Sequence, residues 1–486
     1  MRKSGILLPV FSLPGPFGIG TFSGEAFIFA EKLKKACQSY WQVLPLSPTG
    51  YGDSPYQAFS VFAGNPYFIA PSALCSQGLL TQEECREAYW TGDPILVDYG
   101  WLFETRFKTL RKAFKRFCET DGYRSFVRRN AEWLADFGLY TALKNSMGGI
   151  AWTEWPDDLK FRDRRALKKA AAGLDEEIRF QYFIQYAFFV QWTELKQYAG
   201  RLGVRIIGDM PIYVARDSAD AWASPELFLL DKNGDAAAVA GCPPDAFSED
   251  GQLWGNPLYD WDYHKKTEYA WWIRRIAHAK SMYDRIRIDH FRAFADYYAI
   301  PAGDKTAANG KWHDGPGIDF FRTVEKHLGK TDLIAEDLGM LSPCVYTLLE
   351  ETGFPGMKVL QFAFETGDEN PYLPQNYDHN CVVYTGTHDN DTTLGWYGKL
   401  PDDVRVFAAG HMPGNEITEG FIRMALESRA DLAVIPMQDY LGLGSEARIN
   451  EPATTGKNWR WRMDPGAFTD ALAGRIRNLT EASGRR

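Results

Sequence analysis

The sequence predicts a (β/α)8 barrel, which is a cylinder of parallel strands surrounded by helices. Eight short runs rich in aliphatic, β-branched and aromatic residues recur along its 486 residues. Most of these runs are separated by segments whose apolar residues repeat with the period of a helix. Because strands that alternate with helices form parallel sheets, and because eight such units close into a cylinder, this repetition favours a barrel.

Each of the eight runs is followed by polar or turn residues. In chain order they are ILLP (6–9), YWQVLPL (40–46), VRIIGDM (204–210), RIRIDHF (285–291), LIAEDL (333–338), KVLQFAF (358–364), CVVYTGTHD (381–389) and LAVIPMQD (432–439). Helical spacing is found in GEAFIFAEKLKKA (24–36) after the first run and in DFFRTVEKHLG (319–329) before the fifth. An open, doubly wound sheet is the competing prediction, but GIGTFSG (18–24) does not have the GxGxxG spacing of its phosphate-binding turn.

Two gaps between runs are too long for a single helix. Residues 50–200 are predicted to form a largely helical insertion, since their second half has helical apolar spacing. Residues 211–280 are predicted to form a lid-like insertion, because GCPPDAFSEDGQLWGNPLYDW (241–261) combines Gly, Pro, Asp and aromatic residues without a period. The space after the eighth run suffices for one helix, so residues 1–486 are predicted to be a single barrel domain with insertions.

Charge and composition narrow the partner class. The net charge of -9 and the absence of Lys/Arg runs longer than two residues argue against nucleic acid and against an anionic membrane surface. No stretch of about 18 apolar residues occurs, so no transmembrane helix is predicted. Pro9 and Pro14 interrupt the first apolar run, which therefore does not read as a signal peptide. The seven scattered cysteines form no CxxC pair, which favours a reducing compartment, and a cytoplasmic location is expected.

Four of the runs carry, at their last residue or within two residues of it, an acidic residue that we expect at the mouth of the barrel. These residues are Asp209, Asp289, Glu336 and Asp389. A single carboxylate at this position is equally well explained as the cap of the following helix. Four of them would converge on the mouth of the barrel, where active sites of this fold lie and where like charges must be relieved by cations, hydrogen bonds or raised pKa values. The convergence predicts an active site built on carboxylates.

Two of these carboxylates have surroundings that favour opposite protonation states. Arg287 precedes Asp289 by two residues on the same strand face, and its cation favours the ionised form that a nucleophile needs. Glu336 follows the apolar residues LIA, and an apolar environment raises the pKa of a carboxyl and suits a proton donor. A retaining glycosidase mechanism needs such a pair, with the two groups about 5 Å apart.

Aromatic residues in loops indicate a sugar substrate. Phe, Trp and Tyr make up 15% of the chain. Tyr51, Tyr56, Tyr99, Trp254 and Trp459 lie in Gly-, Pro- and Asp-rich surroundings, where their rings can stack on the apolar faces of sugars. An alternative of equal weight is that each ring anchors an insertion to the barrel. His290 and His388 stand out from the other histidines because each adjoins one of the proposed catalytic aspartates.

The sequence resembles the 4-alpha-glucanotransferases (amylomaltases, or disproportionating enzymes) of glycoside hydrolase family 77 in the α-amylase clan. The resemblance extends over almost the whole chain. It is carried by LPGPFGIG, YWQVLPLSPTGYGDSPYQAFSVFAGNPY, GDMPIYVARDSADAW, PPDAFSEDGQLWGNPLYDW, RIDHFRAF, AEDLG, VLQFAF, GTHDNDT and IPMQDYLGLG. It implies a (β/α)8 barrel, no cofactor, and transfer of α-1,4-glucan segments to a maltooligosaccharide or glucose by a retaining double displacement. It also implies that the protein is a monomer or a homodimer.

Site residues follow from the resemblance by position. It implies that Asp289 is the nucleophile, Glu336 the acid/base and Asp389 the third carboxylate, which stabilises the transition state. The residues that it assigns to substrate binding are Asp209, Arg287, His290 and His388 at the donor glucose, Tyr56 and Trp254 at further subsites, and Tyr51 and Tyr99 at a second glucan-binding surface.

Two departures separate the chain from ordinary amylases of the clan. DMPIY (209–213) lacks the usual Asn-His ending, and no β-sandwich is expected after the barrel. The first departure removes the residues from which a structural calcium would be argued, and no metal site is predicted. An α-1,4-glucan hydrolase of the amylase type and a non-catalytic glucan-binding barrel are the alternative functions.

Overall fold

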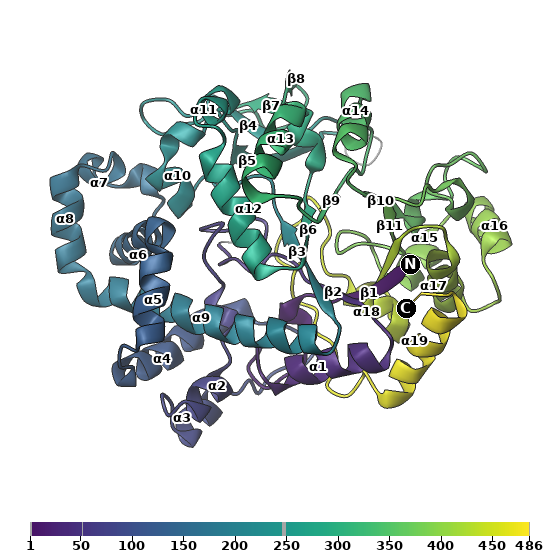
Figure 1. Ribbon diagram of the computed structural model, residues 1–486, viewed down its shortest axis with the longest axis horizontal. Coiled ribbons are helices and arrows are strands. Elements are labelled where there is room, and N and C mark those ends of the chain that lie inside the picture. The colour runs from purple at the N-terminus through teal and green to yellow at the C-terminus, as the bar shows by residue number, and fades with distance from the viewer. Residues whose placement is uncertain (1, 51, 245–248, 486) are drawn as a thin grey trace.

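An eight-stranded parallel sheet lies at the centre of the computed structural model, which describes residues 2–50, 52–244 and 249–485 (Figure 1). All eight predicted strands are present. They are β1 (Lys3–Leu7), β2 (Tyr40–Gln42), β3 (Arg205–Met210), β6 (Arg285–Ile288), β9 (Leu333–Ala335), β10 (Gly356–Val359), β11 (Cys381–Tyr384) and β12 (Leu432–Pro436). The predicted (β/α)8 barrel is thereby confirmed.

The sheet closes into a cylinder. Its hydrogen-bonded order is β10-β11-β12-β1-β2-β3-β6-β9, and every pairing in it is parallel. The two ends of this order meet where the amide of Ala335 donates to the carbonyl oxygen of Pro355 at 3.0 Å. The amide of Met357 also donates to Asp337 Oδ1 at 2.6 Å. The carboxyl ends of all eight strands therefore surround one mouth.

Side chains that alternate along the strands fill the interior of the barrel. The buried cluster inside it consists of Leu7, Tyr40, Ile207, Ile334, Met357, Val382, Tyr384, Leu432 and Val434. Because side chains in a strand alternate between faces, the next inward positions beyond Ile207 and Ile334 are Asp209 and Glu336. Arg287 is the register partner of Asp209 on β6. The apolar interior thus ends in a layer of charged groups at the mouth.

Helices surround the cylinder on its outer face. They include α1 (Gly24–Lys35), α9 (Asp175–Arg201), α12 (Ala270–Met282), α13 (Gly317–Leu328), α14 (Pro343–Thr352), α17 (Ile417–Glu427) and α19 (Asp470–Ala482). The helices predicted over 24–36 and 319–329 correspond to α1 and α13. A second, larger apolar cluster joins the helices to the outward side chains of the strands. Residues 360–380, all of which are described, contain no α-helix, so β10 and β11 are joined by loops.

Most of the helices that lie away from the cylinder belong to residues 50–200, which are coloured purple to blue in Figure 1. These are α2 (Pro71–Ser76), α3 (Gln82–Glu87), α4 (Tyr99–Arg116), α5 (Asp121–Arg129), α6 (Ala131–Ser146), α7 (Asp157–Lys160) and α8 (Arg164–Gly173). The range also includes α9, which packs on the barrel, since the indole N–H of Trp192 donates to the carbonyl oxygen of Met282 at 3.0 Å. The division of the chain into a barrel and two insertions stays a prediction.

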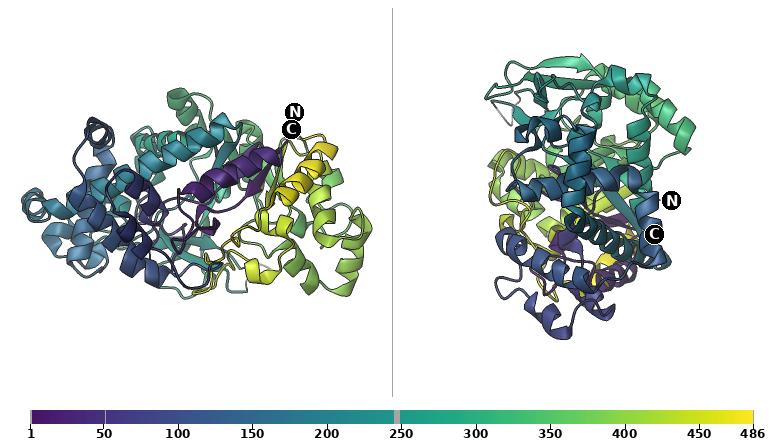
Figure 2. Two further views of the ribbon diagram at one scale, coloured as in Figure 1. Left: turned by 90° about the horizontal axis from the view of Figure 1, so that it is seen from below. Right: turned by 90° about the vertical axis from the view of Figure 1, so that its left-hand side faces the viewer.

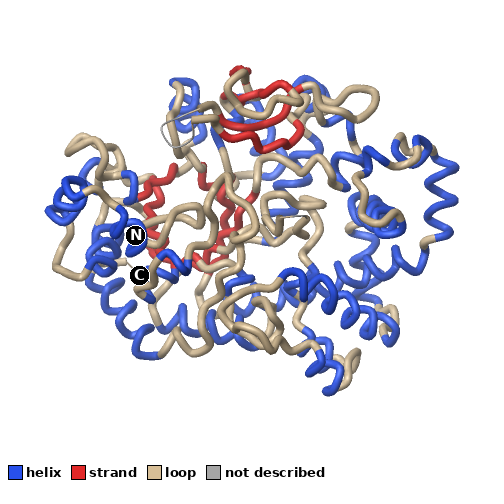
Figure 3. Tube along the Cα trace, turned by 180° about the vertical axis from the view of Figure 1, so that it is seen from behind, coloured by secondary structure: helices blue, strands red, loops and turns tan. Residues whose placement is uncertain are grey.

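A second sheet, which the sequence did not predict, stands apart from the barrel (Figure 3). It is antiparallel, with the order β5-β4-β7-β8, and consists of β4 (Ala238–Cys242), β5 (Gln252–Pro257), β7 (Asp296–Pro301) and β8 (Lys311–Asp314). The segment 241–261 was predicted to be a loop without period. That prediction is wrong for β5, whose residues are held by pairing with β4. Residues 245–248 of that segment lie outside the described residues.

The remaining helices lie on both sides of the barrel. They are α10 (Ala219–Ala223), α11 (Trp261–Lys266), α15 (Thr393–Lys399), α16 (Asp402–His411) and α18 (Met437–Leu441). The two ends of the described chain lie together in both views of Figure 2, where the guanidinium of Arg485 donates to the carbonyl oxygen of Lys3 at 2.8 Å. After β12 the described residues form helices and loops without a β-sandwich. None of the helices in the described part of the chain has the length and apolar character that crossing a membrane requires.

Candidate active site

Arg287 lies between two carboxylates at the mouth. Its Nη1 atom is 2.8 Å from both carboxyl oxygens of Asp209 and 2.9 Å from Asp289 Oδ1. Burial raises the pKa of Asp209, and the adjacent guanidinium opposes that rise. The Asp289 side chain is 27% exposed, whereas those of Arg287 and Asp209 are 4% and 0% exposed. Of the two carboxylates that Arg287 pairs, Asp289 is therefore the more exposed.

Glu336 is tied to the end of β6 beside Asp289. Its backbone exchanges hydrogen bonds with β6 and the following turn, from Glu336 N to the Ile288 carbonyl at 3.1 Å and from Phe291 N to the Glu336 carbonyl at 3.0 Å. Its two carboxyl oxygens accept from the amides of His290 at 2.6 Å and Leu338 at 3.0 Å. The strands that carry Asp289 and Glu336 are neighbours in the sheet. Their carboxyl groups therefore flank one space, and the separation of about 5 Å stays a prediction.

Burial raises the pKa of Glu336 to about 7. Arg287 opposes this rise, the charge of Asp289 adds to it, and the two amide hydrogen bonds also oppose it. Burial outweighs these stabilising contacts because the carboxylate loses bulk water that two amide hydrogen bonds and one guanidinium do not fully replace. This rise in the pKa is the direction expected from the apolar residues that precede Glu336. The group can thus carry a proton near neutral pH and release it again.

His290 adopts a left-handed backbone conformation, with φ 47° and ψ 51°. Such a conformation is strained for a residue with a side chain, and here it aims the amide at Glu336. Burial lowers the pKa of His290 to about 4, against the charge of Asp289. The imidazole is therefore neutral near pH 7. Its ring meets Trp254 of β5 edge to face, with the ring centres 4.8 Å apart.

Asp389 lies in the loop after β11 and is held by residues of the loop after β12. Its Oδ1 accepts from Asn450 Nδ2 at 2.6 Å, and its Oδ2 is 3.3 Å from His388 Nε2. The guanidinium of Arg448 donates to the carbonyl oxygen of Asp389 at 2.8 Å. Sequence analysis did not identify Asn450, which is 61 positions from its partner. The signal that could have drawn attention to it is the pair of polar residues Arg448 and Asn450 in the segment between the last barrel strand and the last helix.

Tyr56 connects opposite sides of the mouth. Its hydroxyl donates to Asp209 Oδ2 at 2.9 Å, and its ring stacks on His388 with the centres 5.2 Å apart and the planes 11° apart. Trp459 tilts against the same two rings. The hydroxyl of Tyr99 donates to the carbonyl oxygen of Trp459 at 2.8 Å, so Tyr99 supports this aromatic wall from behind. Tyr51 lies outside the described residues, and the second glucan-binding surface stays a prediction.

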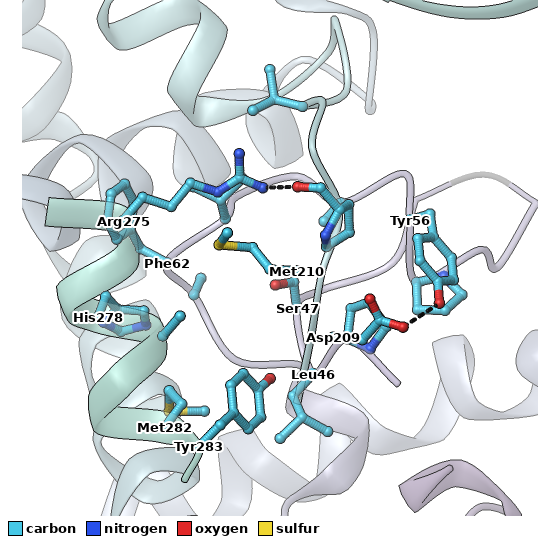
Figure 4. A pocket seen from close by; sticks show the side chains of 18 of the residues that line it. Leu46, Ser47, Tyr56, Phe62, Asp209, Met210, Arg275, His278, Met282 and Tyr283 are labelled. Carbon is cyan, nitrogen blue, oxygen red and sulfur yellow. Dashed lines mark hydrogen bonds between the residues drawn. The ribbon is translucent and has the colours of Figure 1, made fainter. Parts of the chain in front are cut away.

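A small pocket of about 50 Å³ lies behind Asp209 (Figure 4). Tyr56 and Asp209 stand at one end of it, while Arg275, His278 and Met282 of α12 form the opposite wall. Asp289, Glu336 and Asp389 do not line it. The pocket thus separates the barrel strands from their helices and belongs to the support of Asp209 rather than to the place where the carboxylates meet.

Comparison with known proteins identifies the family of the chain. A family model described as 4-alpha-glucanotransferase, of glycoside hydrolase family 77, matches residues 8–468. The chain belongs to this family. Within the family, the chain is 45% identical over 483 residues to the 4-alpha-glucanotransferase of Clostridium butyricum, covering 98% of this chain and 99% of the relative. It is 46% identical over 501 residues to the 4-alpha-glucanotransferase of Thermus thermophilus, covering 100% and 99%.

The fold matches that of a solved family member. The amylomaltase from Streptococcus agalactiae, in complex with acarbose, superposes with a TM-score of 0.97 at 40% identity, over 100% of both chains. The relatives match the chain over its full length and share one activity. The chain is therefore an enzyme that acts by transglycosylation. An amylase-type hydrolase and a non-catalytic barrel are not favoured.

Proposed function

We propose that this enzyme transfers α-1,4-glucan segments by a retaining double displacement, with Asp289 as nucleophile, Glu336 as acid/base and Asp389 as third carboxylate. The observation that carries the assignment is the difference between the two carboxyl groups on neighbouring strands. Asp289 is ion-paired with Arg287 at 2.9 Å, whereas Glu336 forms no ion pair among the described residues and its pKa is raised to about 7. Asp289 is suited to attack as an anion, and Glu336 is suited to donate a proton.

The first displacement uses both groups in these states. The O–H of Glu336 protonates the glycosidic oxygen while a carboxylate oxygen of Asp289 forms a bond to the anomeric carbon. The bond between that carbon and the leaving oxygen breaks, and the leaving chain departs with a free 4-hydroxyl. The second displacement reverses the roles. Ionised Glu336 takes the proton from the 4-hydroxyl of an acceptor, whose oxygen displaces Asp289 and restores the original configuration.

The surrounding side chains provide the donor site. Asp209 and Asp389 supply carboxylate oxygens that accept from sugar hydroxyls, and Arg287 and His388 supply donors beside them. The ring of Tyr56 presents an aromatic face next to these polar groups, as sugar binding requires. The neutral ring of His290 lies next to Asp289 and can donate to a hydroxyl of the donor without adding charge. A neutral glucan is the substrate that this mixture of paired charges and aromatic rings favours. We also propose a cytoplasmic location, which the scattered cysteines support.

Given pure maltotriose, the enzyme should produce a ladder of longer and shorter maltooligosaccharides together with glucose, with almost no net gain in reducing ends. Transfer conserves the number of glycosidic bonds, whereas hydrolysis consumes them. Chromatography of the products and a reducing-end assay on the same samples measure the two outcomes. A steady rise in reducing ends at the rate of maltotriose loss would make the enzyme a hydrolase.

Trp254→Ala should raise the ratio of hydrolysis to transfer several-fold. Water is present at about 55 M, so an acceptor competes only where the protein holds it beside the intermediate and excludes water. Trp254 lies against His290, which is next to Asp289, and its backbone is anchored by Gln57 Nε2 at 3.4 Å. Its indole can stack on the acceptor ring. Glucose release and oligosaccharide formation from maltotriose give the ratio.

Leu253→Ala is the matched control for this variant. Leu253 is the neighbour of Trp254 on β5, is 42% exposed, and points to the opposite face of the strand. Its removal should leave the ratio unchanged. An unchanged ratio in Trp254→Ala would remove this part of the predicted lid from the mechanism.

A further inference from the structure

A cleft of about 260 Å³ opens on the flank of the barrel. Its walls come from the start of α6, from α10 and from the outer face of α12. Figure 1 shows α6 and α10 between the outlying helices α7 and α8 and the barrel helix α12. None of the residues assigned to the active site lines this cleft, and no strand end reaches it. It is therefore separate from the mouth of the barrel.

The half-buried indole of Trp133 is the main apolar surface of the cleft, and the buried indole of Trp271 adds little to it. Trp133 of α6 is half-buried, and its N–H donates to Asn130 Oδ1 at 3.0 Å, which fixes the orientation of the ring. Trp271 of α12 is 5% exposed and lies on the facing side. Aromatic faces held in place beside polar groups bind ligands that combine apolar and hydrogen-bonding surface.

The polar lining is close to neutral as a whole. Glu132 and Arg274 face each other across the opening, with Oε2 and Nε 3.5 Å apart and with 76% and 51% of their side chains exposed. Asp220 is buried in the lining, and its Oδ2 accepts from the amide of Val61 at 2.9 Å. Asp136 pairs with Arg162 at 2.6 Å. The guanidinium of Arg129 also lines the cleft, so three carboxylates face the guanidiniums of Arg129 and Arg274, and a phosphate or another anion finds no net attraction.

We propose that this cleft binds a segment of a long α-1,4-glucan while another part of the same chain occupies the barrel mouth. The proposal rests on the substrate class given under Proposed function. A glucan has no charge, has an apolar ring face that can lie on the indole of Trp133, and has hydroxyls that pair with carboxylate, guanidinium and amide groups. Because the cleft opens to solvent, it can take an internal stretch of a chain whose ends lie elsewhere. A second contact on one chain raises its effective concentration at the active site.

Filling the cleft should therefore change the kinetics on long substrates and leave the kinetics on short substrates unchanged. Removal of Trp133 is the obvious change, but its ring also packs against Phe62, Phe137 and Phe189, and the variant can lose stability. Ala277 is an exposed residue of α12 that lines the cleft, so Ala277→Trp fills it from the surface. We expect the KM for amylose to rise about 3- to 10-fold, with kcat/KM for maltotriose unchanged.

Ala471→Trp is the matched control. Ala471 is an exposed alanine of α19, which has the same length of 13 residues as α12 and lies on another side of the barrel. Its replacement should change neither the KM for amylose nor the kcat/KM for maltotriose. An amylose KM that is equal in the Ala277→Trp variant and the unmodified enzyme would overturn the proposal, and so would equal losses on amylose and maltotriose.

A binding measurement that does not depend on turnover gives the second test. Hydrogen–deuterium exchange of the Glu336→Gln protein with saturating maltohexaose should slow in residues 129–136 and 271–278 as well as around the barrel mouth. Adding Ala277→Trp should abolish the protection at the cleft and retain it at the mouth. Protection at the mouth alone in the Glu336→Gln protein would overturn the cleft as a glucan site. Failure of the catalytic assignments would appear instead as turnover by Glu336→Gln and would leave this pattern unchanged.

Discussion

Asp289→Asn should lower kcat on maltotriose by about 10³-fold or more, because a carboxamide cannot form the glycosyl ester on which both displacements depend. The fold should persist, since Arg287 keeps both of its hydrogen bonds to Asp209. Binding should persist as well, because Tyr56, Asp209 and His388 are unchanged. Initial rates from product chromatography, thermal unfolding and calorimetric titration with maltotriose separate these three quantities.

Asp284→Asn is the control from the same segment of chain. Asp284 immediately precedes β6, at the end of that strand opposite to Asp289, and its Oδ2 accepts from the amide of Ile206 at 2.7 Å. An asparagine oxygen can accept the same bond, and the position is remote from the mouth. Its rate should stay close to that of the unmodified enzyme. A near-normal rate in Asp289→Asn would instead show that another group is the nucleophile.

The barrel could be predicted from the sequence because its strands are defined by local composition. Most of these strands are short runs of apolar residues that are largely buried on both faces, and polar residues follow them at the mouth. The small antiparallel sheet lacks this signal. All four residues of β8 are exposed, and β4 consists of small residues whose pairing with β5 shifts register between Val239 and Gly241. These strands exist because they pair with one another, which composition does not reveal.

The carboxylates of the site were predictable for a similar reason. Asp209 and Glu336 continue the inward alternation of β3 and β9, so the position of each follows from strand period and strand end. The contacts that hold the site together were not predictable. Asn450 meets Asp389 from a loop 61 residues away, and Tyr56 joins Asp209 to His388 across the mouth. Such contacts depend on how the loops fold over the barrel, and no local pattern specifies them.

The alkaline limb of kcat/KM should fall near pH 7 and should belong to Glu336. Burial raises the pKa of this carboxyl from its ordinary 4.5 to about 7, so it is protonated below that pH and ionised above it. The first displacement needs the proton, and activity is therefore lost as the pH rises through the raised pKa. A pH profile of kcat/KM on maltotriose measures this limb. A flat profile up to the range in which tyrosine and lysine titrate would contradict the role of Glu336 as acid.

Glu336→Gln should lower kcat on maltotriose by about 10²- to 10⁴-fold and remove the alkaline limb, because the amide can neither donate nor accept the proton that is transferred.

A maltosyl fluoride donor does not need the acid in the first displacement, since fluoride leaves without protonation. With this donor the variant should still form the ester at Asp289 but should pass it on slowly, because no base activates the acceptor hydroxyl. Mass spectrometry of the denatured variant should therefore show a maltosyl adduct on the peptide that contains Asp289. Glu350→Gln, an exposed glutamate of α14, should show normal turnover of both donors. If Glu336→Gln is equally slow with both donors and carries no adduct, Glu336 does not serve as the proton donor.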